Sequence, residues 1–224
     1  AFTAHTHAAD QYPTKPIRLI MPNAPGSSND ILSRLLAARL GELLGQQVVI
    51  DNRAGAGGVI GVETAAHAVP DGYTLVAASS ATHSIAPHIY KRLGYDVNKD
   101  FTPISLFVIT QNLLAVNPAL PVKSVRELID YAKARPGKIN MASAGAGSTS
   151  HLAGIMFATL AGIDVVHVPY KGGGPSVTSV VAGEAQWVFT PIAGPLPQVK
   201  AGRLRALAVG GAQRSSVAPD IPTV

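Results

Sequence analysis

The sequence contains no cysteine, which excludes disulfides, thiolate metal sites and a cysteine nucleophile. Charge is also scarce, because Asp, Glu, Lys and Arg make up 14% of the 224 residues and basic residues outnumber acidic ones by only 18 to 13. The basic residues are scattered, with no run longer than the Lys91-Arg92 pair, whereas a nucleic-acid groove gathers them on one face. We therefore expect no nucleic-acid partner.

Long apolar runs are missing as well. The longest, Ile104 to Val116, is interrupted by Thr110-Gln111-Asn112 and is shorter than the roughly 20 residues that a membrane helix needs. The sequence therefore predicts a soluble protein. The start of the chain, Ala1 to Asp10, has the small residues typical of a signal-peptidase site. We interpret it as the remainder of an export signal, with a remnant of cloning as the alternative.

Motifs of metal and covalent chemistry are absent too. None of the seven histidines forms a pair with zinc-helix spacing, and His5-x-His7 lies at the N-terminus, so we expect no metal site. No Gly-x-Ser-x-Gly elbow occurs, and Ser148 or Ser150 beside His151 are neighbours in sequence only. We therefore expect no catalytic residue and no cofactor, and predict that the protein is not an enzyme.

The residues that are abundant favour an α/β fold. Hydrophobic residues make up 47% of the chain, and 22 glycines and 17 prolines indicate many tight connections. Ile17 to Met21 reads as a strand, Ile31 to Leu44 keeps helical spacing until Gly45, and Val48 to Ile50 reads as a buried strand. This order predicts a βαβ unit with parallel strands.

The alternation of helices and strands continues along the chain. The further predicted helices are 58–68, a helix capped by Ser124 with Glu127 and ending at Pro136-Gly137, 148–160 and 175–181. The further predicted strands are 73–78, 139–142, 165–168, 186–189 and 205–209.

The alternation is interrupted once, by two successive extended segments at 101–109 and 113–116. Such a crossing lets a few backbone dihedrals absorb a closing motion, so we interpret it as a hinge between two lobes. The predicted division is a first lobe at 1–102, a second lobe at 103–220 and a return crossing at 221–224.

Two turns between a strand and a helix carry the strongest functional signal. The first is Pro25-Gly26-Ser27-Ser28-Asn29-Asp30 and the second is Ser143 to Ser150, one in each predicted lobe. The unpaired N–H groups of a first helical turn favour an anion, and ligands of α/β sheets bind beyond the carboxyl ends of the strands. In the first turn, capping by Ser28 or Asn29 alone is an equally good interpretation, and Asp30 is interpreted as structural.

Dinucleotide binding is disfavoured by the glycine patterns. Gly145-x-Gly147 has Ser150 where the third glycine is needed, and no acidic residue follows at the ribose-binding position. Gly55-Ala56-Gly57-Gly58 has Ile60 at the third position and is better explained as a tight turn.

The assembled motifs resemble the Bug family, the solute receptors of tripartite tricarboxylate transporters, over the whole chain. The segments that carry the resemblance are Tyr12 to Arg18, Pro25-Gly26 with Asp30, Leu44 to Val49, Asn52 to Gly61, Pro70 to Leu75, Tyr95 to Pro103, Pro136 to Lys138, His167 to Gly172 and Leu204 to Val209. Their order and spacing matter more than any single segment.

The resemblance implies a two-lobed periplasmic binding protein of type II, each lobe a mostly parallel sheet flanked by helices. It implies a protein exported to the periplasm that captures a small carboxylate and delivers it to membrane permease subunits by hinge closure. A dicarboxylate, a tricarboxylate, an acidic amino acid and an aromatic acid all remain possible ligands. By position, the implied ligand-binding residues are Pro25, Gly26, Ser27, Ser28, Asn29, Ser79, Ser80, Thr82, Ala144, Gly145, Gly147, Ser148, Thr149, His151 and Tyr170.

This sequence departs from the family pattern in two places. Ser27 stands where the family usually has a second glycine, which adds a hydroxyl to the first turn. The sequence ends at Val224, where family members continue and return to complete the first lobe. For the full-length protein we expect a monomer. Without that segment, apolar faces of the first lobe would be exposed.

Two other functions remain open at this point. An effector-binding lobe pair of a transcription regulator shares the fold, although DNA-binding helices are missing and the start resembles that of an exported protein. A Rossmann-type oxidoreductase is the enzymatic alternative.

Overall fold

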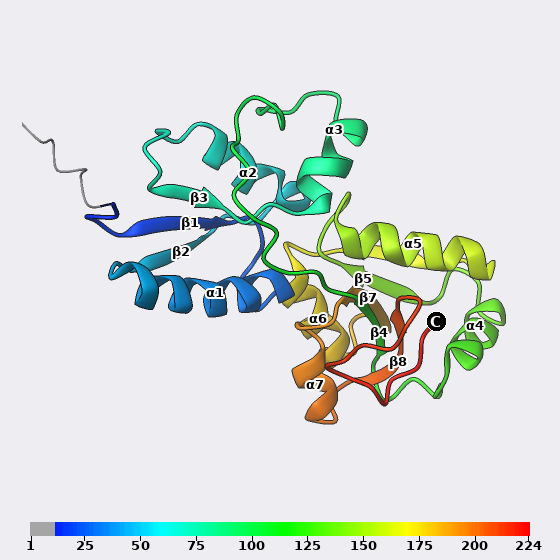
Figure 1. The fold of residues 1–224 in the computed structure, drawn as a ribbon. Helices are drawn as coiled ribbons and strands as arrows, with labels where there is room; N and C mark the ends of the chain where they lie inside the picture. Colours follow the sequence, from blue (N-terminus) through cyan, green and yellow to red (C-terminus); the bar gives the residue numbers. More distant parts are fainter. Residues whose placement is uncertain (1–11) are drawn as a thin grey trace, which may run out of the picture.

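The computed structural model describes residues 12–224. Residues 1–11, which include His5, His7 and the segment interpreted as an export-signal remainder, lie outside the described residues. The described chain forms two lobes side by side, each built on its own sheet and flanked by helices (Figure 1). The predicted two-lobed α/β fold is confirmed.

The first lobe contains a small sheet in the order β2-β1-β3, in which both neighbours of β1 run parallel to it. Helix α1 covers one face of this sheet and α2 the other (Figure 1). The elements are β1 (Ile17–Met21), α1 (Ser28–Leu44), β2 (Val48–Asn52), a 3₁₀ turn η1 (Ala56–Gly58), α2 (Val59–Ala66), β3 (Thr74–Val76), a π-helical turn η2 (Ala81–Ile85) and α3 (Ala86–Ile89).

The second lobe contains five strands in the order β6-β5-β7-β4-β8. Its elements are β4 (Asn112–Val116), α4 (Val125–Lys133), β5 (Asn140–Ser143), α5 (Thr149–Ala161), β6 (Val166–Pro169), α6 (Gly173–Ala182), β7 (Trp187–Pro191), α7 (Leu196–Lys200) and β8 (Arg205–Gly210).

The sheet of the second lobe is mixed. Strand β5 runs parallel to β6 and β7, but β4 is antiparallel to both β7 and β8. The register explains this direction, because Asn112 at the start of β4 pairs with Pro191 at the end of β7. The chain arriving from the first lobe therefore enters the sheet at the edge where the parallel strands end, and runs away from that edge.

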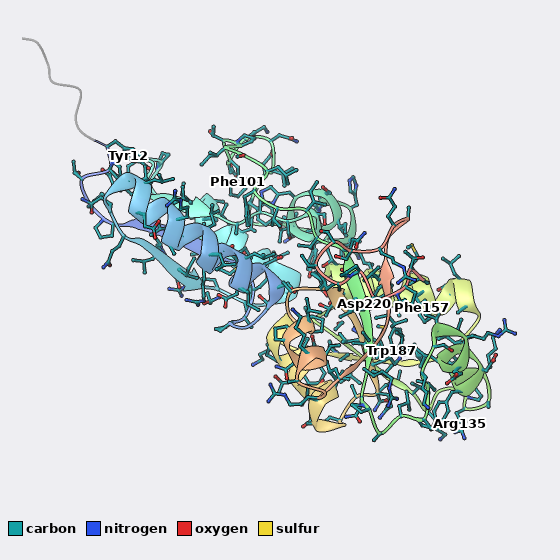
Figure 2. The ribbon with its side chains drawn as sticks, turned by 60° about the horizontal axis from the view of Figure 1, so that its bottom comes forward. Tyr12, Phe101, Arg135, Phe157, Trp187 and Asp220 are labelled. Atoms are coloured by element: carbon teal, nitrogen blue, oxygen red, sulfur yellow. The ribbon has the colours of Figure 1, made fainter. Side chains whose placement is uncertain are left out.

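Two apolar layers hold the second lobe together, one on each face of its sheet. Leu114 and Val116 of β4 face the layer under α4 and α5, whereas Leu113 and Ala115 face the layer under α6 and α7. Such alternation is what a strand with period-two side chains produces. Trp187 lies in the first layer, fully buried, with its ring centroid 5.6 Å from that of Phe157 (Figure 2). This packed core positions the strand ends that carry the second turn.

The segment 101–111 connects the two lobes without a helix or strand of its own (Figure 1). Ile104, Leu106 and Ile109 are exposed along it, and Leu35 and Leu43 are exposed on α1. Residues 222–224 lie along β8, where Thr223 forms a parallel bridge with Val209. The predicted lobe boundaries and the return crossing at 221–224 remain predictions, because the strands and contacts do not by themselves define a hinge.

Candidate ligand-binding cleft

The two predicted turns lie at one cavity between the lobes. Sequence-predicted residues that line it are Ser27, Ser28, Asn29, Ser79, Thr82, Ala144, Ser148 and Thr149. The other lining residues are Asn23, Gly57, Gly58, Ala81, Ser150, Gly173, Thr190 and Pro191. The predicted residues that do not line it are Pro25, Gly26, Ser80, Gly145, Gly147, His151 and Tyr170.

The cavity is narrow, and its lining is polar but uncharged. None of the lining residues is Asp, Glu, Lys, Arg or His. The cavity volume of about 30 Å³ holds roughly two water molecules. A ligand larger than water therefore requires the lobes to separate before it can enter.

In the first turn, Ser27 is the N-cap of α1. Its hydroxyl accepts a hydrogen bond from the Asp30 N–H at 3.2 Å, and the Asp30 carboxylate in turn accepts from the Gly26 N–H at 2.9 Å. The turn needs a glycine directly before the cap, because Gly26 has a φ of 75° that other residues rarely adopt. Ser27, and neither Ser28 nor Asn29, is thus the capping residue.

Asp30 ties this turn to the rest of the first lobe. Besides Gly26, its carboxylate accepts hydrogen bonds from Asn52 Nδ2 at 2.8 Å and from Arg34. Burial is the largest influence and opposes ionisation, but the hydrogen bonds from Arg34, Asn52 and Gly26 outweigh it and lower the pKa of Asp30. The structural role expected for Asp30 agrees with these contacts.

The second turn has the same backbone arrangement. Ser148 is the N-cap of α5, and its hydroxyl accepts from the His151 N–H at 3.2 Å. Gly147, directly before this cap, has a φ of 76° and donates its N–H to His151 Nδ1 at 3.2 Å. A histidine therefore occupies the position that an aspartate occupies in the first turn.

The N–H groups of Gly26 and Gly147, central to the predicted anion site, are thus already bonded within their own turns. The N–H groups of the first two residues of each helix have no acceptor among the described residues, as expected for the first turn of a helix. These free donors belong to Ser28, Asn29, Thr149 and Ser150, and all four residues line the cavity. The free donors therefore lie inside the helices and begin two residues after the predicted glycines.

Ser28 also connects the two lobes directly. Its hydroxyl donates to the Pro191 carbonyl oxygen at 2.5 Å and accepts from the Gly194 N–H at 2.7 Å. Both partners lie at or after the end of β7 in the second lobe, so one buried hydroxyl uses its donor and its acceptor across the cleft. No local pattern in the sequence reveals this bridge, because Ser28 and Pro191 are 163 positions apart.

Glycines allow the lobes to approach closely at two further points. A Cβ at Gly57 would lie 2.9 Å from the Ala146 carbonyl oxygen, and a Cβ at Gly172 would lie 2.6 Å from Ala24 Cβ. In both pairs one residue belongs to each lobe. The tip of the second turn therefore rests against the first lobe.

Several lining residues escaped sequence reasoning. Asn23 Oδ1 accepts from Asn29 Nδ2 at 3.0 Å, and Thr190 lies near the end of a strand that was not recognised as part of the site. The strand-end rule that identified the two turns applies equally to β1 and β7, and would have found both residues.

Within residues 12–224, no helix combines the length and apolar character of a membrane span, and no group of three or more His, Asp or Glu residues could hold a metal. The rings of His151 and His167 stack with a centroid distance of 4.1 Å, but no third ligand joins them in this part of the chain.

Known proteins share this architecture. Residues 32–224 match the model of the tripartite tricarboxylate transporter family receptor. The protein BugT of Bordetella pertussis is 38% identical over 218 residues, which cover 97% of this chain and 67% of BugT. The chain thus spans about two thirds of the length of this relative.

Two solved structures are similar in fold and sequence. An adipate-bound protein of R. palustris has a TM-score of 0.92 and 37% identity, with 95% of this chain and 71% of that chain covered. MatC from Rhodopseudomonas palustris, with bound malate, has a TM-score of 0.87 and 32% identity, with 95% and 72% covered. The matched family is one of transporter receptors and not of enzymes.

Proposed function

The chain belongs to the receptor family of tripartite tricarboxylate transporters, and we propose that it captures a small dicarboxylate between its lobes and presents it to the permease subunits of such a transporter. The observation that carries this proposal is the pair of matching helix starts, whose free N–H groups line one cavity from opposite lobes. Adipate and malate, the ligands of the two solved neighbours, are both dicarboxylates.

The uncharged lining suits this ligand class. Backbone N–H groups and hydroxyls can hold a carboxylate without a buried cation, which would be costly to keep in an empty cleft. The proposed first-lobe contacts are Ser28, Asn29, Ser79 and Thr82, and the proposed second-lobe contacts are Ala144, Ser148, Thr149 and Ser150. Of the remaining predicted residues, Gly26, Ser27, Gly147 and His151 would act through the shape of the turns. Pro25, Ser80, Gly145 and Tyr170 lie outside the cavity lining.

Capture requires movement, because the present cavity has room for water only. We place the hinge in segment 101–111, which has no helix or strand to resist bending. The bridge from Ser28 to Pro191 and Gly194 would form on closure and lengthen the residence of the ligand. Since a transporter receptor must meet its ligand before the membrane step, we assign the protein to the periplasm.

The test is a calorimetric titration of the purified protein with adipate, malate, citrate, glutamate and benzoate, with nicotinamide dinucleotides as the enzymatic alternative. The proposal predicts saturable binding of at least one dicarboxylate and none of the dinucleotides. Dinucleotide binding without any carboxylate binding would overturn it in favour of an oxidoreductase. Binding of a monocarboxylate alone would retain the receptor and reject the dicarboxylate class.

A further inference from the structure

Three helices of the protein begin with the same hydrogen-bonded device. A serine caps the helix, and the side chain three residues later accepts from the N–H of the residue before the cap. In α1 this bond joins Gly26 to Asp30 at 2.9 Å, in α4 it joins Lys123 to Glu127 at 2.8 Å, and in α5 it joins Gly147 to His151 at 3.2 Å. Two of the three acceptors are carboxylates, and the one in the second turn of the cleft is an imidazole.

The choice of acceptor matters because of its charge. A carboxylate accepts whenever it is ionised, and a negative charge at a helix N-terminus is favourable. An imidazole accepts through Nδ1 only while it is neutral. Protonated, it would point an N–H at the Gly147 N–H and place a positive charge at the positive end of α5. A charged His151 would therefore lose its hydrogen bond with the Gly147 N–H.

A second histidine supports the first. His167 on β6 stacks on His151 with ring planes 27° apart, and its Nε2 lies 2.6 Å from Ser143 Oγ. That hydroxyl accepts from the Gly145 N–H at 3.1 Å. The two imidazoles thus hold both glycines of the turn, His151 directly and His167 through Ser143.

The surroundings favour the neutral forms. Burial lowers the pKa of His151, and burial followed by the charge of His151 lowers the pKa of His167. Two tyrosines also lie at this turn: Tyr90 after α3 lies near Gly147 and donates its hydroxyl to the Ala56 carbonyl oxygen. Tyr170 after β6 donates its backbone N–H to the Ser143 carbonyl oxygen and its hydroxyl to Glu184. No carboxylate forms an ion pair with either imidazole in this part of the chain.

This turn lies directly against the first lobe, because a Cβ on Gly57 would lie 2.9 Å from the Ala146 carbonyl oxygen. We propose that His151, supported by His167, is a positioning residue that keeps the second turn in its ligand-accepting shape only while neutral, so that acid weakens ligand capture. This inference rests on the proposed function for its effect on affinity, but not for its effect on the turn.

The first experiment measures adipate affinity by calorimetry between pH 7.5 and 5.5 for the native protein and for His151→Asn, whose Oδ1 accepts like Nδ1 but does not titrate. We expect native affinity to weaken about threefold toward pH 5.5, because the lowered pKa of His151 limits its protonation at that pH. The change in log Kd of the variant should be less than half as large. Protonation of adipate itself is common to both proteins. His67→Asn, at an exposed histidine, serves as the matched control, and its adipate affinity should change with pH as that of the native protein does.

The second experiment needs no ligand, so it separates a failure of this inference from a failure of the proposed function. In ¹⁵N-labelled native protein, the Gly147 amide resonance should shift with the same midpoint as the His151 ring, and His151 should carry its proton on Nε2 at pH 7.5. A Gly147 amide that ignores the His151 titration, or equal pH dependence of affinity in His151→Asn and the native protein, would overturn the inference.

Discussion

The first and second turns of the cleft share one backbone design and differ in the side chain that stabilises it. In each, a glycine with a φ near 75° precedes a serine cap, and the third helical residue accepts the glycine N–H. The first turn uses Asp30, which is bonded to three partners, and the second uses His151, which is bonded to one and stacked on another histidine. We therefore expect the same turn geometry to be independent of pH near neutrality in the first lobe and to depend on pH in the second.

The largest expected difference between the turns is in stability. Asp30→Ala should lower the free energy of unfolding by about 3 kcal/mol, because several hydrogen bonds to a buried charge are lost, whereas His151→Ala should cost about 1 kcal/mol. Urea denaturation of both variants and of Asp30→Asn, which keeps an acceptor but no charge, measures these values. Equal losses for the two alanine variants would show that the two acceptors are interchangeable.

The next comparison concerns the first residue of each helix. Ser28→Ala removes both bonds between the lobes and should weaken adipate binding about tenfold, with faster dissociation. Thr149→Val, at the equivalent position of α5, removes a hydroxyl that bonds to no residue of the other lobe within residues 12–224. Small-angle scattering of the ligand-free proteins should show a more open population for Ser28→Ala only. The bridge has no role in closure if both variants scatter like the native protein.

Acid should affect the turns in different pH ranges. The pKa of His151 is lowered in the folded protein, so the unfolded chain binds more protons below about pH 6.5 and stability falls there. The pKa of Asp30 is also lowered, so its stabilisation is complete above pH 3.8 and is lost only as the pH falls further. In urea denaturation, the free energy of unfolding should fall between pH 7.5 and 5, and His151→Asn should make this fall smaller by up to about 1 kcal/mol. If the substitution leaves the fall unchanged, the pH dependence comes from other histidines.

The smallest expected effect comes from the contact between the second turn and the first lobe. Gly57→Ala introduces a Cβ 2.9 Å from the Ala146 carbonyl oxygen. Because this close approach keeps the two lobes slightly farther apart, the substitution should weaken adipate binding about threefold. Gly202→Ala is the matched control, because Gly202 has a similar φ of 71° but no atom within 4 Å of the place that a Cβ would take. Equal affinities for the two variants would mean that this contact does not limit closure.

The sequence was sufficient for the order of the longer elements and for the two turns, because both depend on local patterns. Apolar periodicity identified α1 and α5, and the serine and glycine pairs identified their starts. Short elements such as α3 and α7 were missed, since five residues or fewer carry too little periodicity. The antiparallel direction of β4 follows from where the chain enters the second lobe, which no local pattern records.

The details of the cleft were less predictable. That Gly26 and Gly147 donate within their own turns depends on the rotamers of Asp30 and His151, and the Ser28 bridge depends on the approach of two lobes. These are contacts between residues whose spacing is compatible with several partners. The sequence therefore indicated where a ligand site lies, but not which donors remain free to serve it.

The most direct test of a cleft shared by two turns is an amide-resonance titration of the ¹⁵N-labelled protein with adipate. A shared cleft predicts that the amides of Ser28 and Asn29 and those of Thr149 and Ser150 shift together, with one common dissociation constant. Shifts confined to a single lobe, or located away from both helix starts, would contradict it.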